Sequence, residues 1–212
     1  MTPRDETRRR IRGLYGLADA EASGGDPLRM AAWLLEGGCR LIQLRCKGWD
    51  PEEVLRAARA LAPPCRQVGA TLLVNDHVEV AVAAGADGVH LGQRDPDAAA
   101  ARRLLGPDRI LGRSTNALDQ VPAATTGADY LAFGPVWPTG NVSRPKEVQG
   151  IEALREARAL APDLPLVAIG GITAARLPAI RAAGADAWAV IGAVAGAEDP
   201  VAATRALAAP PG

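Results

Sequence analysis

The sequence predicts a single α/β domain folded as a (β/α)8 TIM barrel. Eight short runs of the 212-residue chain are almost entirely apolar, which is typical of parallel strands that are covered on both faces. Stretches rich in alanine, leucine and arginine separate these runs and are typical of helices. Eight strands alternating with helices in a chain of this length favour a closed barrel over an open doubly wound sheet. The open sheet is the alternative, but residues 17–20 read LADA where dinucleotide-binding sheets have a glycine-rich turn.

The elements follow one another without a domain boundary. We expect the strands, in chain order, at residues 13–19, 39–45, 71–76, 88–92, 110–115, 130–136, 166–171 and 187–193. Helices between them include residues 51–67, 151–161 and 174–183. Several strands follow a glycine that ends a helical stretch. Glycine is typical of this C′ position, because the residue that ends a helix there often adopts the left-handed conformation. Three of these glycines share the pattern Gly-Ala-Asp, at residues 85–87, 127–129 and 184–186. Residues 1–10 are the only candidate for a flexible tail.

The composition excludes several classes of function. Basic and acidic residues balance at 24 each, so we expect no nucleic-acid partner and no attraction to an anionic membrane. No apolar run reaches the ~18 residues that a membrane span needs. The first residues lack the apolar region of a secretory signal, so we expect a cytoplasmic protein. A homo-oligomer is compatible with the sequence.

The three cysteines and two histidines predict neither zinc nor a disulfide framework. The cysteines form no CxxC pair, and their odd number argues against a set of disulfides. His90 lies in the middle of an expected strand, and we interpret it as a hydrogen-bonded core histidine rather than as a catalytic one.

Polar residues at the ends of the second to fourth strands predict a binding site, because barrel enzymes place their chemistry at the carboxyl ends of the strands. Gln43, Arg45 and Lys47 alternate and so share one face, which favours an anion-binding row over exposed salt bridges. Asp76 and Asp95 follow neighbouring strands. They could hold Mg²⁺, which usually takes one or two carboxylates, or they could cap the helices that follow them.

Two further segments point to phosphate binding. Gly171 follows the seventh strand and Gly192 the eighth, the usual position of a phosphate site in a TIM barrel. Residues 137–150 contain two prolines and two glycines and form the longest expected loop. A loop of this length at the catalytic face is typical of a lid or ligand clamp, and the alternative is a mobile, solvated loop.

Five segments, in this order, closely resemble the thiamine-phosphate synthase superfamily, which also contains thiazole tautomerases. The resemblance runs from about Leu41 to Asp199, most of the chain, and the segments that carry it are QLRCK, LLVNDHVEVAVAAGADGVHLGQRD, LGRST, GADYLAFGPVWPT and LVAIGGI. The resemblance implies a TIM barrel. It also implies a transferase that joins hydroxymethylpyrimidine diphosphate to hydroxyethylthiazole phosphate and releases diphosphate.

The resemblance also implies site residues, carried over by matching motif. The residues expected to contact the pyrimidine diphosphate are Gln43, Arg45, Lys47, Asn75 and Ser114. Of these, Arg45, Lys47 and Ser114 are the expected catalytic residues. Asp76 and Asp95 would bind Mg²⁺, the expected cofactor. Thr139 begins the clamp loop, and Gly171 and Gly192 would hold the thiazole phosphate. The expected partners are therefore small phosphorylated substrates.

The chain departs from the synthase pattern at several positions. The clamp loop usually reads Pro-Thr-x-Thr-Lys, whereas Asn141 and Val142 stand here in place of the last two residues. Gly192 occupies a position where serine is common. The chain has only two lysines, Lys47 and Lys146, and the second lies four residues after the vacant lysine position. We therefore hypothesise that Lys146 neutralises the departing diphosphate.

Two other functions remain as alternatives. A thiazole tautomerase needs no diphosphate site, and the tautomerases resemble one another in a catalytic histidine after the strand-6 glycine, where this chain has Pro135. A barrel that binds a phosphorylated ligand without catalysis is the third interpretation, and the altered loop motivates it.

Overall fold

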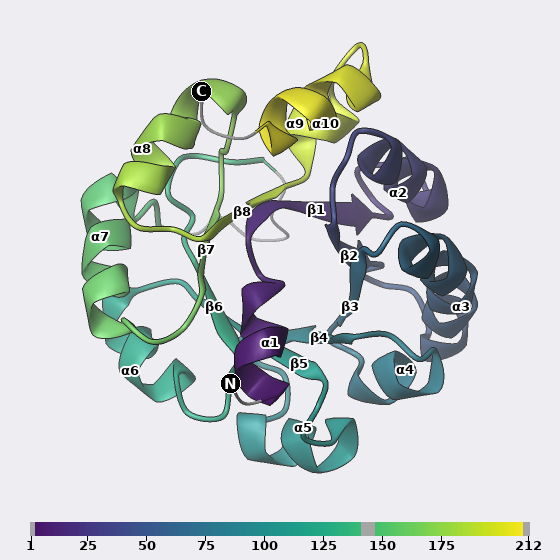
Figure 1. The fold of residues 1–212 in the computed structure, drawn as a ribbon, viewed down its shortest axis with the longest axis horizontal. Helices are drawn as coiled ribbons and strands as arrows, with labels where there is room; N and C mark the ends of the chain where they lie inside the picture. The colour runs from purple at the N-terminus through teal and green to yellow at the C-terminus, as the bar shows by residue number, and fades with distance from the viewer. Residues whose placement is uncertain (1–2, 141–146, 210–212) are drawn as a thin grey trace.

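A computed structural model of the chain describes residues 3–140 and 147–209 and confirms the predicted (β/α)8 barrel. Eight parallel strands each pair with the next, and β8 pairs with β1 to close the barrel (Figure 1). The strands are β1 (Gly13–Asp19), β2 (Leu41–Arg45), β3 (Thr71–Asn75), β4 (Gly88–Leu91), β5 (Ile110–Thr115), β6 (Tyr130–Phe133), β7 (Leu166–Ile169) and β8 (Ala187–Val190). Most of them end earlier than the apolar runs predicted, because the last residues of those runs turn into the loops at the barrel mouth.

The helices, apart from α1, form a ring outside the strands (Figure 1). They are α1 (Pro3–Arg9), α2 (Pro27–Glu36), α3 (Pro51–Gln67), α4 (Val78–Ala83), α5 (Ala98–Leu105), α6 (Val121–Ala124), α7 (Gly150–Leu160), α8 (Leu177–Ala182), α9 (Gly192–Ala195) and α10 (Pro200–Ala208), with short 3-10 helices η1 (Leu118–Gln120) and η2 (Ala174–Arg176). Helix α3 has the predicted bounds, and a capping box between Asp50 and Glu53 explains its start. The helix predicted at residues 174–183 consists of η2 followed by α8.

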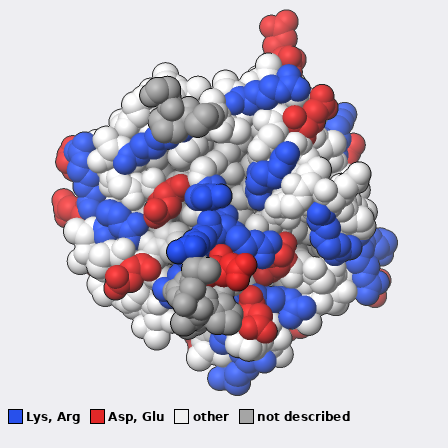
Figure 2. Space-filling view, viewed as in Figure 1, with Lys and Arg blue, Asp and Glu red and all other residues white. Residues whose placement is uncertain are grey.

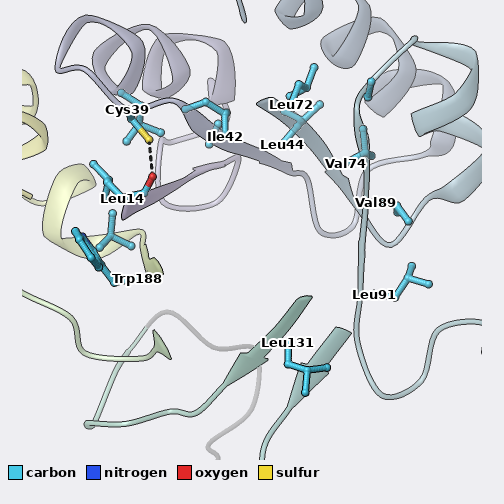
Figure 3. Close-up of a cluster of buried hydrophobic side chains, with 14 of the residues drawn as sticks. Leu14, Cys39, Ile42, Leu44, Leu72, Val74, Val89, Leu91, Leu131 and Trp188 are labelled. Carbon is cyan, nitrogen blue, oxygen red and sulfur yellow. Dashed lines mark hydrogen bonds between the residues drawn. The ribbon is translucent and has the colours of Figure 1, made fainter. Parts of the chain in front are cut away.

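Apolar side chains pack on both faces of the barrel. The larger cluster lies between strands and helices, where Leu14, Ile42 and Leu72 point outward (Figure 3). A second cluster fills the inside of the barrel and includes Tyr15 and Tyr130, both almost completely buried. Leu14 and Tyr15 show the alternation directly, since neighbouring residues of one strand point to opposite faces. This double coverage explains why the strands are apolar throughout.

The candidate tail at residues 1–10 is helical over its described part. Helix α1 lies across the barrel end at which the strands begin (Figure 1). The Arg10 side chain donates to Thr71 Oγ1 at 3.0 Å and pairs with Asp87 at 2.7 Å. Ile11 is 1% exposed and belongs to the cluster inside the barrel. The segment therefore closes the end of the barrel opposite the predicted site.

The Gly-Ala-Asp repeats hold the same end of the barrel together. Their glycines all have a positive φ, as the predicted helix caps require. Each repeat aspartate accepts the backbone N–H of a neighbouring strand at 2.8 Å and pairs with an arginine at 2.6 to 2.9 Å. The ion pairs are Asp87 with Arg10, Asp129 with Arg102 and Asp186 with Arg158. The repeat is thus a structural device, because the chemistry of a TIM barrel lies at the opposite end.

The face of the molecule that is toward the viewer in Figure 2 has no large region of one charge. Figure 2 shows basic and acidic side chains interleaved on the face that is toward the viewer in Figure 1. Within residues 3–140 and 147–209, no helix combines the length and the apolar character needed to cross a bilayer.

Candidate active site

A cavity of about 1010 Å³ opens at the carboxyl ends of the strands. Ten of the eleven predicted site residues line it: Gln43, Arg45, Lys47, Asn75, Asp76, Asp95, Ser114, Thr139, Gly171 and Gly192. The eleventh, Lys146, lies outside the described residues, as do Asn141 and Val142. Four basic and two acidic side chains are among the described residues of the lining, Arg45, Lys47, Arg94 and Arg176 against Asp76 and Asp95. The cavity therefore suits an anionic ligand.

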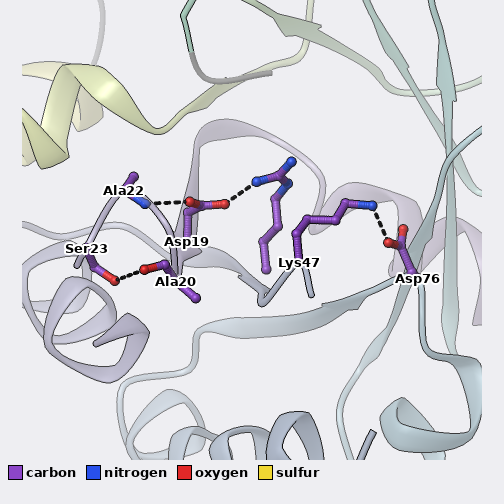
Figure 4. Close-up of polar contacts among 7 residues, drawn as sticks. Asp19, Ala20, Ala22, Ser23, Lys47 and Asp76 are labelled. Carbon is purple, nitrogen blue, oxygen red and sulfur yellow. Dashed lines mark hydrogen bonds and ion pairs between the residues drawn. The ribbon is translucent and has the colours of Figure 1, made fainter. Parts of the chain in front are cut away.

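Asp76 and Asp95 lie next to each other. Asp76 follows β3, and its φ of 66° makes it the only non-glycine with a positive φ in the described chain. Its carboxylate forms an ion pair with Lys47 (Figure 4) and lies within hydrogen-bonding reach of the Asp95 carboxyl group. Burial raises the pKa of Asp95, and the adjacent Asp76 raises it further, whereas the Gly92 N–H at 2.6 Å and Lys47 lower it. The fold thus holds two carboxylates together against their mutual repulsion.

Helix capping does not account for either carboxylate. The N-cap of α4 is His77, which makes no side-chain cap, and the N-cap of α5 is Asp97, whose side chain accepts from the Ala100 N–H at 2.7 Å. Asp76 pairs with Lys47 instead, and Asp95 accepts the Gly92 N–H at 2.6 Å. No group of three or more His, Cys, Asp or Glu side chains suited to a metal occurs in the described residues. Two carboxylates fit Mg²⁺, which usually completes its shell with water and substrate phosphate oxygens.

Arg45 is held in place by a residue that sequence reasoning missed. Its guanidinium pairs with Asp19 at the end of β1, and Asp19 is 3% exposed. Asp19 also accepts the Ala22 N–H at 2.8 Å (Figure 4). In the parallel register of β1 and β2, Asp19 is the partner of Arg45. An acidic residue at a strand end, beside a strand that ends in arginine, is the signal that could have found it.

Five polar side chains form a continuous chain of hydrogen bonds inside the barrel. Gln43 Nε2 donates to the Tyr15 hydroxyl at 2.6 Å, and that hydroxyl lies 2.8 Å from the Tyr130 hydroxyl. The Tyr130 hydroxyl lies 2.7 Å from His90 Nδ1, and His90 Nε2 lies 2.8 Å from Ser114 Oγ. Our interpretation of His90 as buried and hydrogen-bonded is confirmed, but His90 also lines the cavity. Tyr15 and Tyr130 were not predicted as site residues.

The seventh and eighth strands supply the other side of the cavity. Because the barrel is closed in sequence order, β7 lies across from β3 and β8 across from β4. Arg176, which was also missed, lines this side, stacks 4.8 Å from the centre of the Trp137 ring and donates to the Gly171 carbonyl. A Cβ atom at Gly171 would lie 2.7 Å from the Pro138 carbonyl oxygen, so only glycine fits between the strand end and the loop.

The cysteines are not nucleophiles at neutral pH. Cys39, Cys46 and Cys65 are buried, and each is a free thiol. Burial raises the pKa of Cys39 to about 11 and those of Cys46 and Cys65 to about 12. The thiols are therefore protonated at neutral pH, which is typical of structural and not of nucleophilic cysteines.

Comparisons with known proteins agree with this arrangement. The sequence model of the thiamine monophosphate synthase family matches residues 14–194. A thiamine-phosphate synthase from Laribacter hongkongensis is 44% identical over 196 residues, 92% of each chain. A thiamine-phosphate synthase from Chlorobium luteolum is 46% identical over 182 residues, 85% of each chain. The solved thiamine phosphate pyrophosphorylase from Pyrococcus furiosus has a TM-score of 0.85 and 35% identity, over 94% of this chain and 95% of that one. Similarity over so much of the chain, including every strand around the cavity, shows that the chain belongs to the thiamine monophosphate synthase family.

Proposed function

We propose that the protein is a thiamine-phosphate synthase, a transferase that joins hydroxymethylpyrimidine diphosphate to hydroxyethylthiazole phosphate. The observation that carries the proposal is the two-sided cavity. A carboxylate pair with Arg45 and Lys47 lies at the β2–β4 side, and Arg176 with Gly171 lies across from it. A reaction between two phosphorylated substrates needs two anion sites that face each other. The substrates are small and phosphorylated, and we place the enzyme in the cytoplasm.

The pyrimidine diphosphate binds at the β2–β5 side. Arg45 and Lys47 supply positive charge to the diphosphate, and Asn75 and Ser114 supply neutral hydrogen-bonding groups. The ion pair with Asp19 fixes the Arg45 side chain, so its orientation is set before the substrate arrives. Gln43 lies deeper, at the start of the buried hydrogen-bond chain, and we assign it to the pyrimidine ring.

Asp76 and Asp95 are the residues that would hold Mg²⁺. Their carboxylates are adjacent and at the edge of the cavity, which fits a cation that also contacts the substrate. When bound, the ion supplies positive charge between these carboxylates and the diphosphate, which would otherwise repel each other.

The thiazole phosphate binds at the β7–β8 side, with Gly171, Gly192 and Thr139 around it. Gly192 brings no side chain to the phosphate. Arg176 lines the same side, and its guanidinium has five N–H donors, so it can bind a phosphate while it donates to the Gly171 carbonyl. We therefore assign the main positive charge of this subsite to Arg176.

The chemistry needs positioning more than it needs a reacting side chain. The bond between the pyrimidine methylene carbon and the diphosphate oxygen breaks, and a bond from the thiazole nitrogen to that carbon forms. The aminopyrimidine can delocalise the positive charge that develops on the carbon. Arg45, Lys47 and Ser114 stabilise the negative charge that develops on the leaving group. The opposed anion sites aim the thiazole nitrogen at the carbon over the centre of the barrel.

A coupled assay of diphosphate release, with both substrates and Mg²⁺, tests this function. Release that requires both substrates supports the synthase. Binding of thiamine phosphate without turnover would support the non-catalytic barrel. Conversion of a thiazole phosphate tautomer without any diphosphate substrate would support the tautomerase, which Pro135 at the strand-6 position disfavours.

A further inference from the structure

The buried chain from Gln43 to Ser114 connects the two ends of the proposed pyrimidine subsite. Its four links measure 2.6, 2.8, 2.7 and 2.8 Å. The side chains come from β2, β1, β6, β4 and β5, so the chain crosses the inside of the barrel. Tyr15 is 1% exposed and Tyr130 0% exposed. Water therefore does not compete for the hydrogen bonds of the two tyrosine hydroxyls, and their protons must be shared within the chain.

Counting protons fixes the direction of every bond. The amide nitrogen of Gln43 can only donate, so the Tyr15 hydroxyl accepts from it and gives its single proton to Tyr130. The Tyr130 hydroxyl then has one proton left to donate, and it goes to His90 Nδ1. Burial raises the pKa of both phenols, so neither loses its proton at neutral pH.

The donor-to-acceptor direction of these hydrogen bonds continues through His90 to Ser114. A His90 ring that accepts at Nδ1 carries its proton on Nε2, and Nε2 then donates to Ser114 Oγ. The Ser114 oxygen is thereby an acceptor toward His90, and its own O–H proton is directed to a partner in the cavity. At the other end, the Gln43 amide nitrogen is engaged with Tyr15, so Gln43 presents its amide oxygen as an acceptor.

We propose that Tyr130 is a positioning residue that fixes the Nε2–H tautomer of His90 and so makes Ser114 a hydrogen-bond donor toward the substrate diphosphate. The proposal rests on the proposed function for the identity of the ligand. The same chain orients Gln43 to accept from the exocyclic amino group of the pyrimidine. One arrangement of protons thus makes Ser114 a donor to the diphosphate and Gln43 an acceptor from the amino group.

The substrate matches this direction and not the reverse one. A diphosphate oxygen only accepts hydrogen bonds, and an exocyclic amino group mainly donates them. If every bond ran the other way, Ser114 would donate to His90 and present a lone pair to the diphosphate. Gln43 would then present its NH₂ group to the amino group. Both contacts would be repulsive, so the observed orientation of the Gln43 amide selects the productive arrangement.

The ring of Tyr130 is held tightly enough to serve this purpose. A Cβ atom at Gly112 would lie 2.1 Å from Tyr130 Cζ and 2.4 Å from its hydroxyl oxygen, so only glycine leaves room for the phenol. The His90 ring stacks on Tyr130 with a centroid distance of 5.5 Å, and Tyr15 meets Tyr130 edge to face at 6.1 Å. These contacts fix the donor in front of Nδ1.

The tautomer can be read directly by ¹⁵N NMR of the histidine rings in the ligand-free protein. The chain has two histidines, so a His77→Gln variant assigns both ring systems. We expect the neutral His90 ring to carry its proton on Nε2. A neutral His90 that carries the proton on Nδ1 would overturn the proposal, even if the Tyr130 variant did not fold.

Tyr130→Phe and Tyr15→Phe form a matched pair, because each removes one buried hydroxyl. Tyr130→Phe removes the donor to Nδ1 and should give a mixed or Nδ1–H tautomer. Tyr15→Phe leaves the Tyr130 proton available to Nδ1 and removes only the Tyr15 donation that directs it, so the His90 tautomer should shift less than in Tyr130→Phe. The same response of His90 in both variants would show a general loss of structure and not a directed chain.

Kinetics tests the link to Ser114. Tyr130→Phe should lower kcat/KM for the pyrimidine diphosphate about tenfold, the scale of one hydrogen bond, and leave KM for the thiazole phosphate unchanged. In a Ser114→Ala background, Tyr130→Phe should add almost nothing. Additive losses would refute the action through Ser114. Absence of diphosphate release by the wild-type protein would refute the proposed function, while the NMR result would still decide the tautomer.

Discussion

The carboxyl groups of Asp76 and Asp95, which follow different strands, lie within hydrogen-bonding reach of each other at the edge of the cavity. The fold brings them together although neither caps a helix. Burial and the neighbouring Asp76 raise the pKa of Asp95, and the Lys47–Asp76 ion pair offsets only part of the repulsion. An arrangement that costs stability without a ligand is typical of a functional site.

Replacing Asp95 should therefore stabilise the ligand-free protein at neutral pH. A carboxyl group whose pKa is higher in the folded state than in the unfolded state contributes stability at low pH. That contribution is present below the ordinary value of 3.8 and is lost as the pH rises through the raised folded value. The substitution Asp95→Asn keeps a side-chain oxygen for the Gly92 N–H and removes the ionised form. Urea unfolding of wild type and Asp95→Asn at pH 7 and at pH 3 should show a relative gain for the variant at pH 7. An equal difference at both pH values would contradict this.

The same carboxylates should control the dependence on Mg²⁺. Asp76→Asn and Asp95→Asn should each lower turnover by about 100-fold or more and raise the Mg²⁺ concentration needed for half-maximal activity. Asp97→Asn is the matched control, since Asp97 caps α5 and does not line the cavity. Its turnover at saturating and at limiting Mg²⁺ should equal that of wild type. Wild-type rates for both site variants at limiting Mg²⁺ would exclude the metal site.

Arg176 should contribute to binding of the thiazole phosphate. Arg176→Ala should raise KM for that substrate about tenfold, the scale of one charge-assisted contact, with little change in KM for the pyrimidine diphosphate. Arg181→Ala is a suitable control. Arg181 also stacks on a tryptophan, Trp188, at 4.6 Å, but it lies outside the site cavity. Equal effects of the two substitutions on KM would mean that loss of arginine stacking, and not of a phosphate contact, is being measured.

The sequence predicts the fold and most of the site because both follow from local patterns. Apolar runs mark the eight strands, and polar residues at the strand ends mark the cavity. The residues that were missed make their contacts at the site with residues that are distant in sequence, and only the closed barrel brings these residues together. Tyr15 and Tyr130 are 115 positions apart and look like ordinary core aromatics until their hydroxyls meet inside the barrel. Arg176 is one of 22 arginines, and what distinguishes it is its place at the β7 side of the cavity, where it donates to the Gly171 carbonyl. The roles of the site residues and the role of Lys146 remain predictions.

The Gly-Ala-Asp repeats should affect stability and leave catalysis unchanged. Asp129 is 1% exposed, accepts the Leu111 N–H at 2.8 Å and pairs with Arg102, whose side chain is 19% exposed. Asp129→Asn can keep the bond to Leu111 but leaves a partly buried guanidinium without its counter-charge, which should cost about 3 kcal/mol of unfolding free energy.

Asp87 provides the comparison that isolates burial of the ion pair. It accepts the Leu72 N–H at 2.8 Å in the same way, but its partner Arg10 is 41% exposed. Asp87→Asn should therefore cost only about 0–1 kcal/mol. Both sites lie at the end of the barrel opposite the cavity, so kcat and both KM values should stay at wild-type levels below the unfolding temperature. Denaturant unfolding and steady-state kinetics of both variants test this prediction. Equal losses of unfolding free energy would show that the repeat aspartates stabilise the fold through the hydrogen bond to the strand N–H and not through the ion pair. Altered kinetics in either variant would show that the two ends of the barrel are coupled.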